Sequence, residues 1–357
     1  MMNTANIIET VNISHEVIWQ PWAVSYFFFI GLAVCAALLS LMWTLFKRSG
    51  WESAGRMSVV VMLTCAIVAP VALVADLHQP GRFWHFYTHF TPWSWMSWGA
   101  FFLPLFVVLA LIYGWICLRT QTAEGERLPA IIKPLGLLLG VMALLVALYT
   151  GEEVMVLKSR PMWHTYALPF LYFFSGFVGA AGLALLFKAI YEPNEIDSGR
   201  KLARTLSLFS FLTLLVLGGW VYLGMTGMSD TAQRAFAVMQ QSAHWKMLGM
   251  SLAVLFGIPL LIGLFMKRGW FLVLVGLLGV AAAWLLRWVI FMDGQLIPKT
   301  GAGEYTYQLP MGSEGILGIV GVFGLWLFIT IVVTSFFFGS STAKDTISNP
   351  DLAKLAH

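Results

Sequence analysis

Long apolar runs, separated by short polar segments, follow one another along the whole chain. A helix needs about 20 apolar residues to cross the roughly 30 Å hydrocarbon core of a membrane, and nine of these runs meet that length. They cover residues 22–46, 57–76, 95–118, 131–157, 166–188, 205–228, 246–266, 270–293 and 315–338. The pattern predicts an all-α fold, a polytopic bundle of about nine transmembrane helices.

The composition agrees with a membrane protein, because 59% of the 357 residues are hydrophobic and only 11% are charged. Ordinary soluble domains have roughly 25% charged residues. The segments between the runs are too short to fold a soluble catalytic domain, so any bulky cofactor chemistry belongs to a partner. The net charge is +4 and no basic block is present, which makes nucleic acid an unsuitable partner.

The distribution of lysine and arginine predicts the orientation of the bundle. With the N-terminus outside, 14 of the 21 Lys and Arg residues fall on the cytoplasmic side and 7 on the outer side. Cytoplasmic loops carry the excess of positive charge in membrane proteins. Because nine spans place the two ends on opposite sides, we predict an outer N-terminus and a cytoplasmic C-terminus.

Ionisable residues inside the runs cost at least a few kcal/mol each in a bilayer and therefore mark candidate functional sites. Under the predicted orientation, all of them lie in the outer half of the membrane. They are Asp76, Glu152, Glu153, Arg287 and Asp293. Tyr149, Glu152 and Glu153 stand at positions i, i+3 and i+4 of one helix, a spacing that predicts a shared face and a common pocket.

Two interpretations of these polar residues remain open. Arg287 is the natural counter-charge for Asp76, Glu152 or Glu153, so the group can be an ion pair that only holds helices together. The convergence of His78, His164 and His244 on the same membrane face favours a ligand pocket instead. A quinol enters from lipid and must lose two protons on oxidation, which requires a carboxylate or histidine as the acceptor.

The chain offers no ligands for a redox metal. Paired histidines at mid-span would indicate haem, but all seven histidines stand outside the span centres. Cys35, Cys65 and Cys117 occur singly, without the spacing of an iron–sulfur motif. His85 and His89 alone are a weak metal signal. We therefore expect no haem, no iron–sulfur cluster and no metal site in this chain.

Two stretches resemble the signature of the NrfD/PsrC family of quinol-interacting membrane subunits. The first is Asp76-Leu77-His78-Gln79-Pro80-Gly81-Arg82-Phe83-Trp84, and the second is the Ser97-Trp98-Gly99 element at the start of the third span. The segments Tyr149-Thr150-Gly151, Arg160-Pro161-Met162-Trp163 and Leu285-Leu286-Arg287-Trp288 also agree with the family. The resemblance covers roughly residues 20–295. The family includes the membrane subunits of polysulfide, thiosulfate and tetrathionate reductases, and the additional ninth helix resembles the tetrathionate type.

The resemblance implies a haem-free subunit of the bacterial cytoplasmic (inner) membrane that oxidises menaquinol or ubiquinol near the periplasmic face. It also implies that electrons pass to a ferredoxin-like four-cluster iron–sulfur partner and then to a molybdopterin catalytic subunit, which reduces a sulfur compound such as tetrathionate or polysulfide. In other members of the family the electrons pass to a multihaem cytochrome instead. In the family, an Asn and a His on the first helix and a Tyr on the fourth contact the quinone. The tyrosine corresponds to Tyr149, whereas Ala23 and Tyr26 replace the other two.

Together, the residues and the resemblance divide the chain and assign the site. We predict a periplasmic segment over 1–21, an eight-helix quinone-interacting core over 22–295, a periplasmic loop and ninth helix over 296–338, and a cytoplasmic tail over 339–357. Tyr149 is assigned to a quinone carbonyl and Glu152 or Glu153 to proton acceptance. Asp76 and Arg82 are assigned to a proton exit or to anchoring of the loop, and His78 is assigned as a second hydrogen-bond donor. The further quinone contacts are Tyr26, His164 and Arg287.

The sequence is also compatible with two other functions. The same buried acids and arginine suit a proton- or ion-translocating subunit without a redox site of its own. Such a relay needs polar residues in the inner half as well, where the sequence offers mainly Thr64, Ser207 and Ser210. A purely structural anchor would have no need of the outer carboxylates.

Overall fold

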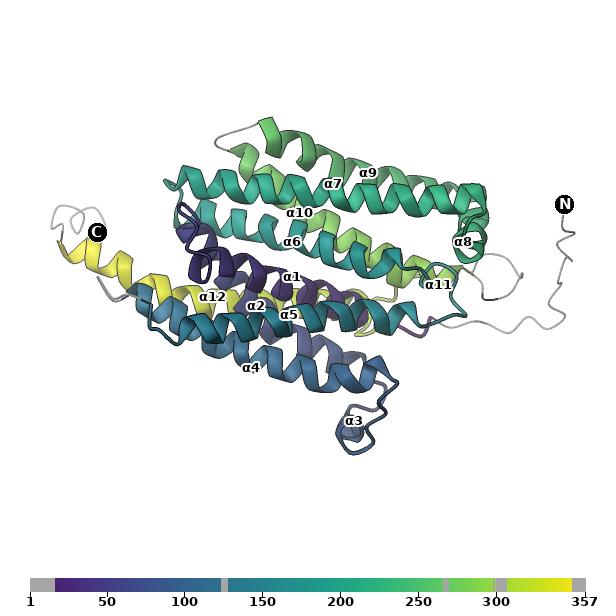
Figure 1. Ribbon diagram of the computed structural model, residues 1–357, viewed down its shortest axis with the longest axis horizontal. Helices are drawn as coiled ribbons and strands as arrows, with labels where there is room; N and C mark the ends of the chain where they lie inside the picture. Colours follow the sequence, from purple (N-terminus) through teal and green to yellow (C-terminus); the bar gives the residue numbers. More distant parts are fainter. Residues whose placement is uncertain (1–16, 123–127, 266–269, 298, 300–306, 349–357) are drawn as a thin grey trace, which may run out of the picture.

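The computed structural model of the protein describes residues 17–122, 128–265, 270–297, 299 and 307–348, and helices are the regular secondary structure within these ranges. Nine helices are long and apolar enough to cross a membrane within the described residues, which confirms the predicted fold (Figure 1). They are α1 (Pro21–Thr44), α2 (Glu52–Asp76), α4 (Trp95–Thr122), α5 (Ile132–Met155), α6 (Ala167–Tyr191), α7 (Ile196–Thr226), α9 (Ala243–Phe265), α10 (Trp270–Trp288) and α12 (Ile316–Ser348).

Short helices mark one end of the bundle. The loop after α2 contains η1 (Pro80–Arg82) and α3 (His85–Thr88), and α8 (Asp230–Gln241) connects α7 to α9. A π-helical turn, η2 (Val289–Asp293), and the short α11 (Gly294–Leu296) prolong α10 at the same end (Figure 1). We call this the α3 end; it is the side that the charge distribution predicts to be outside.

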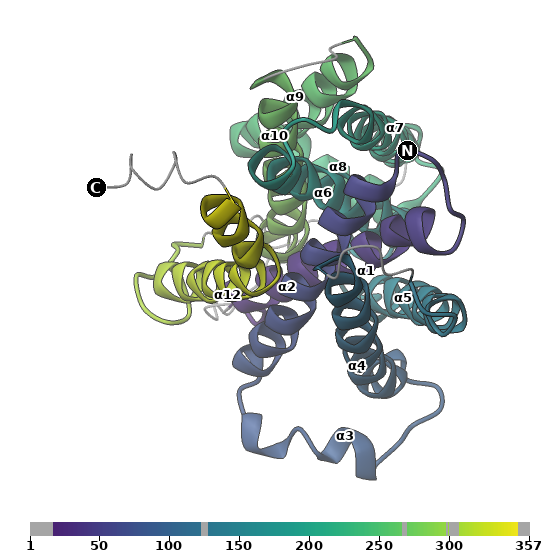
Figure 2. The ribbon, with the colours of Figure 1, turned by 90° about the vertical axis from the view of Figure 1, so that its left-hand side faces the viewer.

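Eight of the nine spanning helices form two groups of four, which meet where α1, α2 and α5 contact α6, and α12 packs beside them against α2 (Figure 2). One group contains α1, α2, α4 and α5, and the other contains α6, α7, α9 and α10. α1 is almost entirely buried, whereas α7, α9 and α12 present many apolar side chains on the outside of the bundle. In lipid these exposed apolar faces need no partner, so the pattern fits a bundle embedded in a bilayer.

α2 and α7 both begin earlier than the apolar runs predict, at Glu52 and Ile196 rather than at residues 57 and 205. Their extra turns are charged, and a search for apolar runs excludes charged turns. Across this end of the bundle Arg56 pairs with Glu192 at 2.6 Å, and Lys201 Nζ donates to the Ser49 carbonyl. Partial burial alone would raise the pKa of the Glu192 carboxyl, but the hydrogen bonds from Arg56 hold that pKa below its usual range.

Two further elements differ from the sequence-based expectation. α8 lies where the apolar runs predict only a connecting loop; its apolar residues Ala232 and Ala235 are buried, and Ser229 caps it by accepting a hydrogen bond from the Ala232 N–H. α12 continues to Ser348 and so enters the predicted tail. Residues 1–16 and 349–357 of the two predicted terminal segments lie outside the described part of the chain.

The predicted orientation can be tested at the α3 end. In a variant with Cys35, Cys65 and Cys117 replaced, Gln79→Cys places a thiol on an exposed residue of the loop after α2. We expect an impermeant maleimide to label it in intact spheroplasts. Asn194→Cys, exposed at the opposite end, is the matched control and should be labelled only after lysis. The reverse pattern would place the α3 end in the cytoplasm.

Candidate functional site

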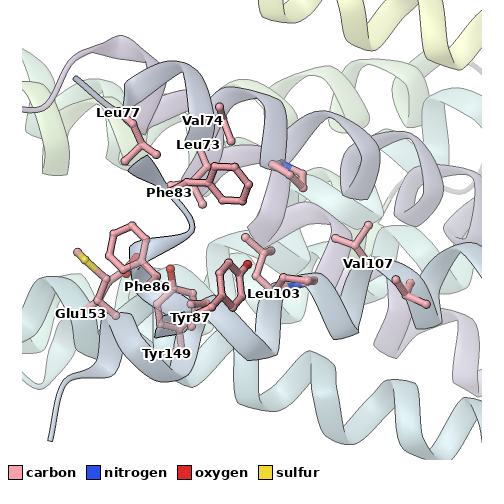
Figure 3. A pocket seen from close by; sticks show the side chains of 16 residues that line it. Leu73, Val74, Leu77, Phe83, Phe86, Tyr87, Leu103, Val107, Tyr149 and Glu153 are labelled. Atoms are coloured by element: carbon pink, nitrogen blue, oxygen red, sulfur yellow. The ribbon is translucent and has the colours of Figure 1, made fainter. Parts of the chain in front are cut away.

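An apolar cavity of about 390 Å³ opens between α2, α4 and α5, at the α3 end of the bundle. Phe83, Phe86 and Tyr87, from the segment around α3, line it together with Tyr149 and Glu153 of α5 (Figure 3). Val74 and Val108 line the cavity and are also exposed on the side of the bundle. A lipid-soluble molecule can therefore enter from the apolar side surface without passing through water.

The prolines inside the two helices that border this cavity are part of its wall. Pro70 lies within α2 and Pro104 within α4, and both line the space. A proline inside a helix removes a backbone hydrogen bond and bends the helix. Bent helices cannot pack along their whole length, which is a local reason for the gap between α2 and α4.

Tyr149 and Glu153 are the polar groups of this cavity. Tyr149 is buried, and its hydroxyl lies 3.3 Å from the hydroxyl of Tyr26 on α1. The Glu153 carboxyl, one helical turn further along α5, interacts with the Tyr149 hydroxyl. The structure thus brings together three of the predicted site residues, Tyr26, Tyr149 and Glu153, from helices far apart in the sequence.

A second cavity of about 210 Å³ begins where the first one ends. It is lined by Tyr26, Asp76, His78 and Glu153, together with apolar residues near the start of α1. Glu153 therefore lies between an apolar space and a more polar one. His78 is exposed, so the polar side leads towards the surface at the α3 end.

Asp76 ends α2 and meets the beginning of α1. Its carboxyl interacts with the backbone N–H groups of Gln20 and Ala23. The first turn of α1 contains no acidic residue and its N-cap, Gln20, makes no side-chain cap. Because the helix dipole favours a negative charge at a helix N-terminus, Asp76 stabilises the start of α1 while it also lines the second cavity.

Glu152 does not share the pocket with Tyr149 and Glu153. It is only partly buried and lines neither cavity. One residue along a helix turns the side chain by about 100°. The structure therefore places Glu153 in the pocket with Tyr149, as the spacing i and i+4 predicts. The prediction that Glu152 shares this pocket is wrong.

Arg287 is not the counter-charge of the acids. Its guanidinium, 1% exposed, donates to Ser175 Oγ and, at 2.7 Å, to the Tyr172 carbonyl, and lies over the Tyr172 ring. Gly31 leaves it room, because a Cβ there would lie 2.9 Å from the guanidinium. The expected ion pair between Arg287 and Asp76, Glu152 or Glu153 is absent from the described residues. Arg287 instead joins α10 to α6.

The remaining predicted residues lie elsewhere. His164 is placed against the end of α5, where its Nδ1 lies 2.7 Å from the Met155 carbonyl. Asp293 pairs with His244 at 2.7 Å on the second group of helices. Arg82 is exposed in η1. None of these four residues lines either of the two cavities around Glu153.

The Ser97-Trp98-Gly99 element has a geometric role that the sequence alone does not reveal. Ser97 Oγ lies 2.7 Å from Thr91 Oγ1, and the Trp98 indole donates to the Pro92 carbonyl, so the two residues fix the turn into α4. A Cβ on Gly99 would lie only 2.1 Å from the Tyr149 ring. Gly99 is therefore the position that lets Tyr149 reach the cavity.

The fold and the site define a class: a multi-pass helical membrane protein with an apolar cavity that opens sideways and ends on a tyrosine and a carboxyl group. The family described as "Polysulphide reductase, NrfD" matches residues 9–299. The chain belongs to this family, which confirms the resemblance found in its sequence.

Individual relatives extend over most of the chain. It is 38% identical to a tetrathionate reductase subunit of Salmonella typhimurium over 342 residues, covering 93% of this chain and 96% of that protein. It is 21% identical to a selenate reductase subunit of Mesobacillus selenatarsenatis over 380 residues, covering 93% and 89%. Protein NrfD of Escherichia coli is 29% identical over 205 residues, covering 51% and 63%.

Proposed function

We propose that this chain is the quinol-oxidising membrane subunit of a bacterial reductase complex. The relatives named as subunits of tetrathionate and selenate reductases support the type of complex. The observation that carries the proposal is the position of Glu153, which lines both an apolar cavity open to lipid and a polar cavity near the surface. A quinol needs this combination: an apolar entrance, a hydrogen-bonding end and an outlet for protons.

The larger cavity is suited to the quinol ring. Ligand pockets of this kind are mostly apolar, with a few polar groups that fix orientation. The Tyr149 hydroxyl can donate to a ring oxygen, and the hydroxyl of Tyr26, 3.3 Å away, holds it in place. A bound menaquinol or ubiquinol supplies two electrons and two protons when it is oxidised.

Glu153 is the proton acceptor in this proposal. Its carboxyl is next to the Tyr149 hydroxyl and can take the two quinol protons one after the other, releasing the first before it accepts the second. From Glu153 the proton leaves through the second cavity, past Asp76 and the exposed His78. Asp76 keeps its helix-capping contacts with Gln20 and Ala23, so its role in proton exit is combined with a role in positioning α1.

The electrons pass to a partner in this proposal, and the described residues contain no group of three or more metal-ligating side chains. Because the site lies at the α3 end, we propose that the partner binds that face. A ferredoxin-like four-cluster iron–sulfur subunit, with a molybdopterin catalytic subunit or a multihaem cytochrome beyond it, is the arrangement we propose. In the predicted orientation this face lies on the periplasmic side, and the family resemblance supports the cytoplasmic membrane as the location that we propose.

Binding is tested with Tyr149→Phe, which removes one hydroxyl and keeps the ring. We expect a short-chain quinol analogue to bind the purified chain about fivefold more weakly, the equivalent of one neutral hydrogen bond of roughly 1 kcal/mol. Tyr166→Phe is the matched control, because Tyr166 is 83% exposed and lines neither cavity. Equal affinities for wild type, Tyr149→Phe and Tyr166→Phe would place the quinol elsewhere.

Proton translocation across the membrane has less support. The hydroxyl groups of Ser40, Thr44 and Tyr113 form a buried cluster in the other half of the bundle. Ser40 is 14 residues from Tyr26 on α1, about 21 Å along a helix. Neither cavity that contains Glu153 is lined by any of the three residues, so the outlet at the α3 end is the better supported route.

A further inference from the structure

A buried glutamine, Gln295 in α11, holds the backbone of the segment that precedes α1. The residue is only 3% exposed. Its Oε1 accepts hydrogen bonds from the N–H groups of Ile18 at 3.1 Å and of Trp19 at 3.0 Å. Its Nε2 donates to the carbonyls of Trp19 and Phe291, each at 2.9 Å. An amide side chain has two donor hydrogens and two acceptor lone pairs, so all four positions are used.

The backbone that carries Gln295 is itself fixed by side chains. The guanidinium of Arg160, which is 7% exposed, donates to the Gln295 carbonyl at 2.8 Å. The Trp163 indole donates to the Ile290 carbonyl in the π-helical turn η2, just before Gln295, at 2.7 Å. Such turns are frequent at functional sites. Gln295 therefore presents its amide to the segment from a fixed position.

The same segment is held on its other side by Asp76. The Asp76 carboxyl interacts with the backbone N–H groups of Gln20 and Ala23. Asp76 ends α2 in the first group of helices, whereas Gln295 prolongs α10 in the second group. The start of the chain is therefore hydrogen-bonded to both groups at the α3 end.

Ile18 and Trp19 are also part of the wall of the second cavity, the space that Asp76 and Glu153 line. Gln295 lines neither this cavity nor the larger one. It can therefore influence the site only through the two residues whose backbone it holds.

We propose that Gln295 is a positioning residue of the proton outlet: it holds Ile18 and Trp19 in place as a wall of the second cavity. The assignment of this cavity as an outlet rests on the proposed function; the role of Gln295 in holding its wall rests on the four hydrogen bonds. Without Gln295, the backbone of the segment must find partners in water, because leaving the groups unpaired is costly. The cavity then widens, and Asp76 loses the fixed position that proton transfer from Glu153 requires.

The width of the cavity is measured with Ala23→Cys in the chain whose native cysteines are replaced. Ala23 lines the second cavity and is 3% exposed. We expect a small charged methanethiosulfonate, applied to lysed spheroplasts, to react about tenfold or more faster when Gln295→Met is added, because methionine keeps the volume and removes the hydrogen bonds. Gln241→Met, at an exposed glutamine of α8, is the matched control. Equal rates with Gln295→Met and Gln241→Met would overturn the proposal.

A second cysteine separates a local change from a general loss of structure. Cys117 of α4 is fully buried and lines neither cavity. In a chain that keeps Cys117 alone, Gln295→Met should leave it unreactive. Equal acceleration at Cys117 and at Ala23→Cys would show that Gln295 only stabilises the bundle, and the proposal would be wrong.

Quinol oxidation supplies a readout that a merely structural role would not move. In Gln295→Met we expect kcat to decrease by about tenfold and KM to stay within about twofold, because the larger cavity keeps its walls while proton exit is slowed. A raised KM with unchanged kcat would overturn the proposal. Absence of quinol oxidation by the wild type would argue against the proposed function, and the cysteine experiment would still decide whether Gln295 holds the wall.

The unmodified chain provides a test that needs no variant. Ile18 is 55% exposed, so its amide exchanges rapidly with solvent unless it is hydrogen-bonded. We expect the Ile18 and Trp19 amides to exchange roughly 100-fold or more slowly than unprotected amides, measured by hydrogen exchange and mass spectrometry with residue-level fragmentation. Exchange at the unprotected rate would show that Gln295 does not hold the segment, and the proposal would fail.

Discussion

Glu153→Gln is expected to slow quinol oxidation by roughly 100-fold or more while the complex still assembles. The substitution keeps the shape of the side chain and its ability to hydrogen-bond to Tyr149, but removes the group that accepts a proton. Loss of a positioned general base typically costs about 100- to 10,000-fold in rate. The measurement is the rate of quinol oxidation by membranes or purified complex, with a soluble acceptor for the electrons.

Glu152→Gln is the matched control for this experiment. Both acids are in the same turn of α5, but Glu152 lines neither cavity. We therefore expect Glu152→Gln to retain nearly the full rate. A large loss in Glu152→Gln with full activity in Glu153→Gln would reverse the assignment. Full rates in both variants and in the double variant would show that the pair is structural.

The fold was predictable because the apolar runs that determine it can be recognised from the sequence alone. A run of about 20 apolar residues satisfies its backbone hydrogen bonds only as a helix when it lies in lipid, so the nine runs fix nine helices. What the runs could not predict are helical turns with charged side chains. These turns make contacts with residues far apart in the sequence: Arg56 of α2 pairs with Glu192, and Ser198 of α7 donates to the Gly50 carbonyl. In α8, Thr231 donates to the His164 carbonyl.

The site was predictable in outline and not in detail. The cost of burying a charge marked Glu152 and Glu153 together with three other ionisable residues, and the spacing of Glu153 from Tyr149 predicted that the two share a helix face, as they do in the structure. The spacing could not separate Glu153 from Glu152, because that depends on which face of α5 turns towards α2 and α4. Charge complementarity predicted an acid beside Arg287, yet a hydroxyl, a carbonyl and an aromatic ring surround its guanidinium instead.

Sequence patterns do not show which glycines allow a neighbouring helix or side chain to approach closely. A glycine in an apolar run has many possible reasons to be there, from flexibility to helix packing. Only the position of the neighbouring helix shows that Gly99 faces the Tyr149 ring, while Gly218 and Gly249 face empty space. The same residue type thus has different consequences in the two groups of helices: one glycine makes room for a side chain, and two others border open space.

Gly99→Ala is expected to reduce quinol oxidation by about 10- to 100-fold, although the added group is one methyl. The new Cβ would lie 2.1 Å from Tyr149 Cε2 and 2.3 Å from Cζ, far inside ordinary contact, so the ring must move by about 1 Å or more. Such a shift breaks the 3.3 Å approach of the Tyr149 and Tyr26 hydroxyls. Misplacement of a positioning group by about 1 Å can cost roughly 100-fold in rate.

The control for this substitution is Gly81→Ala, in the same signature and at the same end of the bundle. A Cβ on Gly81 meets nothing within 4 Å, so this variant should oxidise quinol at the rate of wild type. The rate is measured with the amount of assembled complex held equal, because overpacking alone can cost about 1–3 kcal/mol of stability. If assembled Gly99→Ala matched Gly81→Ala in rate, the position of the Tyr149 hydroxyl would be irrelevant to oxidation, and the apolar cavity could not be the site where the quinol reacts.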